Sequence, residues 1–352
     1  MPQLSAIVPL YNKAPFVLRT LTSMASQSYR DFEVIVVNDG STDGGDEVAR
    51  TFSDSRFRVI DQPNAGPGAA RNRGLAEARG PLVAFLDADD EWYPEYLQRA
   101  VEFLARRPDV AAVSQFYVEA PDRSTEPMWR RRRLMDGTQN MGTLTAELLH
   151  YMVAYMTPPA TVARTEVLRR WGGFYEQRCT FGEDSFLWLK ILLNEPVEFL
   201  MKPGALVHRE SGALSQNLRG ARPLEPFLAH PELAADACPP HLLPVLHGFY
   251  ALRAFKTACV WGYHGDWRRA AEVRRRFRMQ GDFRLPFYVS SWVCSTPAGA
   301  ALSALWRWLP LPRQSNGRQT QSAQTLTVPQ LREHSPESSE QPAHVVRARD
   351  NP

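Results

Sequence analysis

The sequence is poor in the residues that build disulfide or zinc scaffolds. Its 352 residues include four cysteines, which stand far apart at positions 179, 238, 259 and 294. This spacing offers no zinc-binding pair and no disulfide framework, so we expect buried thiols in a reducing compartment. The first residues also lack a basic stretch followed by an apolar core and a cleavage site. We therefore expect no signal peptide and a cytoplasmic location.

The sequence also has little net charge and no internal repeat. Its 41 Lys and Arg against 38 Asp and Glu leave a formal charge of +3, which is too small to indicate a nucleic-acid partner. A hydrophobic content of 44% and a charged content of 22% are those of an ordinary globular protein. The length predicts one large domain or two unequal ones.

What the sequence does contain is a regular alternation of elements. Apolar runs typical of strands buried on both faces alternate with segments of helical period over the first ninety residues. This alternation predicts a doubly wound α/β sheet with ligands at the carboxyl ends of its strands. The expected strands are 4–10, 33–37, 58–61, 82–86 and 110–118, with edge strands at 197–201 and 205–207; the expected helices include 14–28, 94–106 and 161–171.

An acidic cluster follows the fourth expected strand. The stretch FLDADDEW, residues 85–92, places Asp87, Asp89 and Asp90 within four positions. Three like charges this close repel one another unless a cation or water lies among them. Carboxylate oxygens suit a hard cation such as Mg²⁺ or Mn²⁺, and a pyrophosphate is the ligand that would bridge to it.

Polar residues follow the other expected strands as well. Asp39 could accept hydrogen bonds from a base or ribose, Arg71 and the amides near Gly66 and Gly68 could neutralise phosphate, and Tyr11 offers a stacking face. Singly, each is better explained as a turn residue, a surface charge or a core aromatic. Their occurrence together at successive strand ends favours a nucleotide site.

A separate carboxylate is needed if the nucleotide is a donor, because an acceptor hydroxyl must lose its proton as it attacks. Asp184 is our candidate for this general base, since it opens an amphipathic helix after Gly182. An ordinary helix-capping acid explains the same pattern equally well.

Five ordered motifs, SAIVPLYNK, VIVVNDGSTDGG, NAGPGAARNRGL, FLDADDEW and FGEDSFLWLK, resemble those of the family 2 glycosyltransferases of the GT-A fold. The resemblance covers about residues 4–215. It implies an α/β, GT-A type Rossmann-like doubly wound mixed sheet. It also implies a hexosyltransferase that transfers a sugar with inversion from a nucleotide diphosphate sugar, usually a UDP or dTDP sugar, to an acceptor hydroxyl, with divalent Mn²⁺ or Mg²⁺.

The resemblance also assigns the donor residues. Pro9, Tyr11 and Asp39 match nucleotide-binding positions, Arg71 matches a basic residue near the nucleotide, and Asp87 matches the first acid of the DXD motif. In the second motif Asn38 replaces the first of two acids commonly seen; because Asp39 is kept, we expect nucleotide binding to survive.

The metal and the base are assigned in the same way. Asp89 matches the second acid of the DXD motif and is the expected direct metal ligand, helped by Asp87. Asp184 matches the acid of the ED motif that serves as general base. His208 or Arg209 falls where members often carry a basic or metal-approaching residue, and we assign His208 to the metal.

The resemblance ends before the last third of the chain. We expect a catalytic domain over 1–219, a helical extension over 220–312 and a disordered tail over 313–352. The basic run WRRAAEVRRRFRMQ precedes 285–306, a stretch without charge, which suits either a membrane surface or an ordinary helical packing domain. A glycan or lipid-linked acceptor at the inner face of the plasma membrane would fit the first interpretation.

Two other functions remain at this point. A sugar nucleotidyltransferase also uses an α/β sheet with acidic metal ligands, but its Gly-rich basic loop after the first strand is replaced here by Pro9, Tyr11 and Asn12. A non-catalytic nucleotide-sugar binding protein would have the same motifs, yet every catalytic acid is present.

Overall fold

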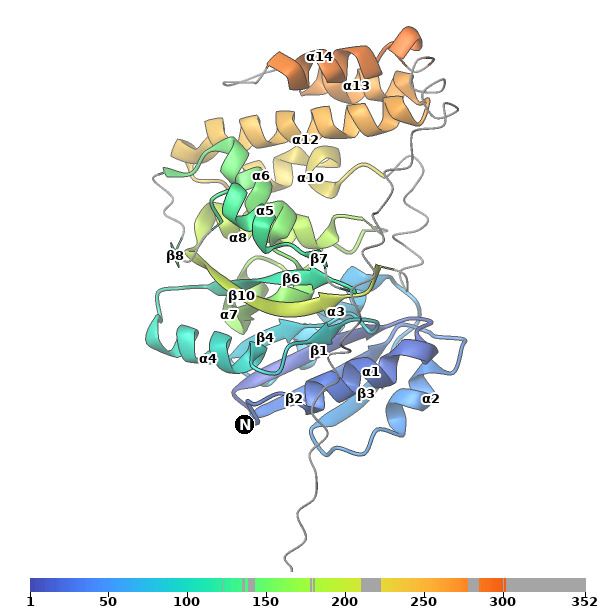
Figure 1. Cartoon of the computed structure of the whole chain (residues 1–352), viewed down its shortest axis with the longest axis vertical. Helices are drawn as coiled ribbons and strands as arrows, with labels where there is room; N and C mark the ends of the chain where they lie inside the picture. Colours follow the sequence, from blue (N-terminus) through green and yellow to red (C-terminus); the bar gives the residue numbers. More distant parts are fainter. Residues whose placement is uncertain are drawn as a thin grey trace, which may run out of the picture. The chain divides into compact units, whose positions relative to one another are not determined.

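A mixed β-sheet forms the centre of the fold in the computed structural model, which describes residues 1–121, 123–134, 137–138, 143–177, 179, 181–209, 223–277, 285–299 and 301 (Figure 1). The strands follow the order β3-β2-β1-β4-β9-β6-β10-β5, with β7 paired to β6 and β8 paired to β10. The first four strands are parallel, whereas β9 and β5 run antiparallel to their neighbours. The predicted mixed α/β sheet is therefore confirmed.

The parallel part follows the predicted alternation closely. Its strands are β1 (Leu4–Leu10), β2 (Phe32–Asn38), β3 (Phe57–Asp61) and β4 (Leu82–Phe85). The helices between them are α1 (Ala14–Ala25), α2 (Gly45–Arg50) and α3 (Pro67–Glu77). Strands β1, β2 and β4 are almost wholly buried, which explains why their sequences read as continuous apolar runs.

The second part of the sheet corrects two predictions. The helix expected over 161–171 begins with a strand, β9 (Thr161–Arg164), and becomes helical only in α7 (Thr165–Arg170). The side chains of Thr161 and Val162 are β-branched and fully buried between β4 and β6 (Ala112–Glu119), where a strand is favoured. The helix therefore begins at Thr165, four residues later than the sequence pattern predicts.

The two expected edge strands form one strand inside the sheet. Strand β10 (Val197–Val207) lies between β6 and β5 (Glu91–Trp92), and its register shifts on both sides of Pro203. Proline cannot donate to a strand ladder, so the sequence indicated a break where the strand instead continues through a bulge.

The remaining elements are short or lie on the faces of the sheet. They are α4 (Tyr96–Arg106), β7 (Arg123–Ser124), α5 (Glu126–Arg131), β8 (Gly137–Thr138), α6 (Ala146–Tyr155), η2 (Pro158–Ala160), α8 (Glu183–Asn194), α10 (Pro226–Ala229), α11 (Pro231–Ala235), η4 (Pro240–Leu242), α12 (Leu243–Tyr263), α13 (Trp267–Arg276) and α14 (Leu285–Cys294). The basic run 130–133 starts inside α5, where Arg130 pairs with Glu126 at 2.6 Å.

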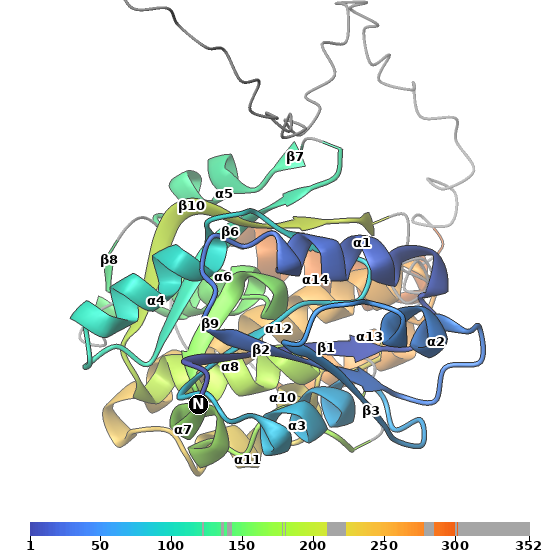
Figure 2. The ribbon, with the colours of Figure 1, turned by 90° about the horizontal axis from the view of Figure 1, so that it is seen from below.

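Helices cover both faces of the sheet (Figure 2). Alternate residues of β1 divide between two apolar cores: Ala6 and Val8 pack with α1 and α4, whereas Ile7 packs with α3, α7 and α8. Side chains of β2 and β4 alternate in the same way. This division confirms the doubly wound arrangement.

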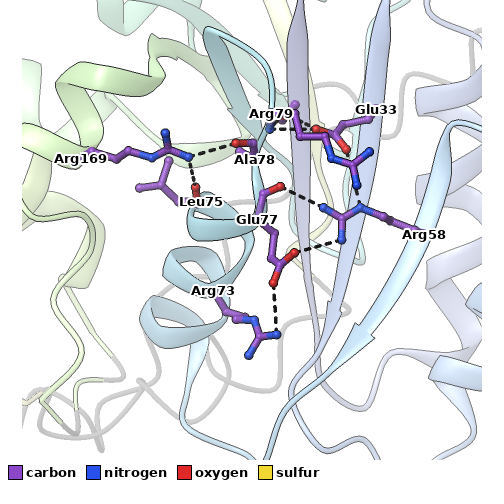
Figure 3. A network of polar contacts seen from close by, with 9 residues as sticks. Glu33, Arg58, Arg73, Leu75, Glu77, Ala78, Arg79 and Arg169 are labelled. Atoms are coloured by element: carbon purple, nitrogen blue, oxygen red, sulfur yellow. Dashed lines mark hydrogen bonds and ion pairs between the residues drawn. The ribbon is translucent and has the colours of Figure 1, made fainter. Parts of the chain in front are cut away.

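A network of polar contacts closes the amino end of the sheet (Figure 3). Buried Glu33 accepts a hydrogen bond from the Ser5 hydroxyl at 2.8 Å and another from the Arg79 backbone N–H at 3.0 Å. The Arg58 guanidinium lies between Glu33 and Glu77, at 3.6 and 3.4 Å. These contacts connect the end of α3 to β1 and β2 at the edge of the sheet where the parallel strands begin.

The C-terminal helices pack on one side of this assembly. Helix α12 lies against α6, and α13 and α14 lie beyond it, away from the sheet (Figure 1). Among the described residues, none of the helices combines the length and apolar character needed to span a bilayer. The predicted boundaries near 219 and 312 and the tail 313–352 lie outside the described residues, so the domain division stays a prediction.

Candidate functional site

Four strands deliver their carboxyl ends to one edge of the sheet, because β1, β2, β4 and β10 run in the same direction. Tyr11 follows β1, Asp39 follows β2 and His208 follows β10, while the acidic segment 86–90 follows β4. The predicted site residues therefore gather at this edge, although their positions in the sequence span about two hundred residues.

The acidic segment is surrounded by cations and hydrogen-bond donors. Asp89 forms an ion pair with Lys13, and its backbone oxygen accepts a hydrogen bond from Arg19 at 2.7 Å. Asp90 is buried, and this burial, together with the charges of Asp87 and Asp89, holds the pKa of its carboxyl well above the usual range. Ionisation of the Asp90 carboxyl is therefore unfavourable.

Arg71 connects the acidic segment to α8. Its buried guanidinium lies 2.7 Å from Asp87 and 2.8 Å from Glu183, and its plane faces the Phe174 ring at 5.3 Å. Burial by itself lowers the pKa of an arginine, but Asp87 and Glu183 outweigh that effect and raise the pKa of Arg71. One permanent cation therefore joins carboxylates that lie 96 residues apart in the sequence.

Asp184 opens α8 beside this cation. Gly182 precedes the helix with a φ of +82°, a conformation that favours glycine, and directs the first turn toward Arg71. Burial and the neighbouring Glu183 raise the pKa of Asp184 to about 7, although Arg71 acts in the opposite direction. A carboxyl with this pKa can take up a proton near neutral pH, as a general base requires.

Both carboxylate oxygens of Asp39 accept hydrogen bonds from the loop that follows β3. One of its oxygens accepts hydrogen bonds from the Gln62 side chain at 2.7 Å and the Ala65 N–H at 2.8 Å, and the other accepts from the Gly66 N–H at 2.9 Å. Asn38, which replaces an acid of the family pattern, accepts from the Ser41 N–H at 2.9 Å. In this structure both residues shape the loops beside the site, and nucleotide contact by Asp39 stays a prediction.

Tyr11 and Pro9 flank the same edge. The Tyr11 side chain is 48% exposed, which leaves a ring face accessible at the end of β1. Pro9 lies within β1 opposite Val37 of β2. These positions are compatible with the stacking role predicted for Tyr11.

His208 joins the acidic segment from the opposite side. Its Nε2 lies 2.9 Å from Glu91, and its backbone N–H donates to Asp90 at 2.8 Å. Arg209 pairs with Glu119 at 2.8 Å, and its positive charge also acts on Asp90. Both residues therefore adjoin the acidic segment, and the assignment of His208 to the metal stays a prediction.

Sequence reasoning overlooked three members of this arrangement. Lys13 and Arg19 contact Asp89, and Glu91 contacts both Arg19 at 3.4 Å and His208. The motif YNK directly after the first strand was a signal for Lys13. Arg19 had no comparable signal, because a helix-surface arginine has many ordinary explanations.

The residues fit a hard divalent cation, although within the described parts of the chain no three His, Cys, Asp or Glu side chains converge as a metal site. The donors offered by Asp87 and Asp89 are carboxylate oxygens, which Mg²⁺ and Mn²⁺ prefer. Burial is the main cause of the raised pKa of Asp90, and a cation beside Asp87 and Asp89 would offset the charges that add to it. Lys13 and Arg71 now supply the compensating charge.

A small cavity borders the start of α8. Its volume is about 40 Å³. Its lining consists of Phe181, Pro223, Glu225, Arg253, Lys256, Thr257, Val260 and Trp261. The buried Glu225 pairs with Arg253 of α12, and a Cβ built on Gly182 would lie 3.3 Å from Glu225. Helix α12 therefore supports the segment that positions Asp184.

Comparison with known proteins identifies the family. Residues 5–171 match the family model described as glycosyl transferase family 2. The chain is 30% identical over 223 residues to the uncharacterized glycosyltransferase EpsJ of Bacillus subtilis, covering 60% of this chain and 62% of EpsJ. It is 35% identical over 124 residues to the putative teichuronic acid biosynthesis glycosyltransferase TuaG of the same organism, covering 34% of this chain and 49% of TuaG. The match thus spans less than two thirds of either relative.

A solved structure shares the fold. The crystal structure of residues 1–349 of Staphylococcus aureus TarS in complex with UDP-GlcNAc superposes with a TM-score of 0.58 at 19% identity, covering 87% of this chain and 92% of that one. At this identity the likeness establishes the fold alone, and it confirms the predicted GT-A type architecture. The five ordered motifs and the family model matched over residues 5–171 identify this part of the chain as a glycosyl transferase family 2 domain.

Proposed function

We propose that the protein transfers a sugar, with inversion, from a nucleotide diphosphate sugar to an acceptor hydroxyl. A UDP or dTDP sugar is the expected donor; TarS, whose fold this chain shares, was crystallised with UDP-GlcNAc. The relative TuaG is named for teichuronic acid biosynthesis. We therefore place the reaction in the synthesis of a cell-surface polysaccharide or glycolipid, with a glycan or lipid-linked acceptor.

The contact that carries this proposal is the Arg71 bridge. Arg71 holds Asp87, from the acidic segment, and Glu183, which immediately precedes Asp184. A donor group placed against the acidic segment therefore lies near the one carboxyl of this edge whose pKa is about 7. Inverting transfer needs this combination, since the base must reach the acceptor while the leaving diphosphate is stabilised.

In this proposal each residue of the site has its own role. Asp184 takes the proton of the acceptor hydroxyl as that oxygen attacks the anomeric carbon from the face opposite the leaving group. Arg71 keeps Asp184 close to the donor and adds positive charge near the phosphates. Tyr11 stacks on the base, and Pro9 and Asp39 shape the nucleotide pocket around it.

Asp89, Asp87 and His208 would hold the divalent Mn²⁺ or Mg²⁺. Such a cation supplies charge stabilisation to the departing diphosphate. Lys13 pairs with Asp89 and Arg71 with Asp87, so a cation would share these carboxylates with both side chains. The positive charge around the acidic segment would then act together with the cation on the donor phosphates.

A nucleotide-sugar panel tests the function directly. The purified chain is incubated with UDP, dTDP and GDP sugars, with Mn²⁺ or with EDTA, and the released nucleotide and sugar are separated by chromatography. We expect metal-dependent release of nucleoside diphosphate and sugar from one donor. A parallel incubation with a nucleoside triphosphate and a sugar 1-phosphate would release pyrophosphate if the protein were a nucleotidyltransferase, and binding without turnover of any donor would identify a non-catalytic binding protein.

A further inference from the structure

Helix α14 presents an apolar face to solvent. Val289, Trp292 and Val293 are 48%, 52% and 36% exposed, although the same helix buries Ser291 against its neighbours. No charged residue occurs between positions 285 and 306. A tryptophan flanked by valines on an exposed helix is unusual for a surface that meets only water.

Contacts with α12 and α13 hold helix α14 in this orientation. Gly262 of α12 lies so close to α14 that an added Cβ would come within 2.0 Å of the Cys294 carbonyl oxygen. The Arg274 guanidinium of α13 donates to the Ser295 hydroxyl at 2.9 Å, just beyond the end of α14. These contacts accompany the burial of Ser291 and Ser295, whereas Trp292 stays exposed.

Helix α13 adds positive charge beside this face. Over 266–276 the chain carries five arginines against Asp266 and Glu272, a net charge of +3. Ala270 and Val273 are buried, whereas Arg268 and Arg275 are exposed. Helices α13 and α14 contact each other and pack on the same helix, α12, away from the sheet (Figure 1).

We propose that the outer sides of α13 and α14 dock on a membrane that contains anionic lipids. The arginines of α13 would contact lipid phosphates, while Trp292 and the two valines would enter the interfacial region without crossing the bilayer. A membrane fits better than a protein partner, because the positive charge is spread along a whole helix and accompanies a shallow, uncharged apolar face. The inference extends the proposed function, since it places a lipid-linked acceptor near the enzyme.

Flotation of the full chain with vesicles tests the proposal. One vesicle set contains phosphatidylglycerol and phosphatidylcholine, and the other contains phosphatidylcholine alone. We expect the chain to float with the anionic vesicles and to be released as salt is raised, because surface electrostatics are screened. Each arginine near an anionic surface is worth roughly fivefold in partitioning, so Arg268→Gln with Arg275→Gln should weaken it about 25-fold.

Matched variants test whether vesicle binding depends on this surface or only on the positive charge of the protein. The double variant Arg106→Gln and Arg131→Gln removes two exposed arginines from α4 and α5 and should float like the original chain. Trp292→Ser should reduce binding even at low salt. Failure of the full chain to float with anionic vesicles, or an equal loss in the α4 and α5 variant, would overturn the proposal. Nucleotide-sugar turnover measured without vesicles reports separately on the proposed reaction.

Discussion

The raised pKa of Asp184 makes the pH dependence of sugar transfer the sharpest test of its role. Burial and Glu183 together place that pKa at about 7. A base must be unprotonated to act, so transfer should fall about tenfold for each pH unit below 7 and level off above it. Between pH 6 and pH 8 the rate should therefore rise roughly tenfold, whereas an ordinary aspartate would give a flat profile over this range.

The assay follows release of nucleoside diphosphate at saturating donor and metal from pH 5.5 to 8.5. Asp184→Asn should lower transfer by about 10²- to 10⁴-fold, the usual contribution of a general base, while donor affinity measured by calorimetry stays within a few-fold. Asp236→Asn on the surface of the chain is the matched control, and it should leave both quantities unchanged.

Stability distinguishes a catalytic loss from an unfolded variant. Because the folded pKa of Asp184 exceeds the unfolded value of 3.8, its contribution to stability is lost as pH rises from about 4 to about 7. At pH 8 the buried carboxylate disfavours folding by roughly 4 kcal/mol at most. Asp184→Asn should therefore melt at the same temperature as the original chain or higher. Full activity in this variant, or a flat profile between pH 6 and 8, would refute the assignment.

Three further substitutions test other contacts. Asp89→Asn should weaken Mn²⁺-dependent donor binding more than about tenfold in calorimetry, and unchanged binding would remove Asp89 from the metal site. Arg253→Met leaves the carboxylate of Glu225 buried without its partner and should cost about 3–5 kcal/mol in urea unfolding, much of which the double variant Glu225→Met with Arg253→Met should recover. Glu33→Gln should cost about 1–3 kcal/mol, because the Ser5 hydroxyl and Arg58 lose a charged acceptor; an unchanged midpoint would show that the network at the amino end is dispensable.

The first part of the fold could be predicted from the sequence because its strands are buried on both faces. Continuous apolar runs marked β1, β2 and β4 almost to the residue, and polar residues after them marked the site. Strand β9 was missed because it has only four residues, Thr161–Arg164, between a 3₁₀ turn that begins with two prolines and a helix. Its position between β4 and β6 depends on contacts with strands about fifty and eighty residues earlier, which no local pattern reveals.

The candidate site could also be predicted only in part. Residue types at strand ends indicated Asp87 and Asp89, and the start of an amphipathic helix indicated Asp184; the roles of these acids stay predictions. The partners of these acids were not, because the Arg71 bridge to Glu183 and the Lys13 contact with Asp89 depend on how separate loops meet. Side chains that cross such distances carry no periodic signal in the sequence.

The short strand β5 also constrains how the protein can fold. Only five residues, 86–90, connect β4 to β5, yet β5 pairs with β10 at the opposite end of the strand order. The acidic segment contains a turn closed by a hydrogen bond from the Asp90 N–H to the Asp87 carbonyl oxygen. Its far end is fixed by the pairing of Glu91 with Leu206, more than a hundred residues later in the chain. Contacts so distant in sequence form late. We therefore expect a growing polypeptide to fix the acidic segment at both ends only after β10 has been made, so that the metal binding proposed for this segment would report the completion of this region.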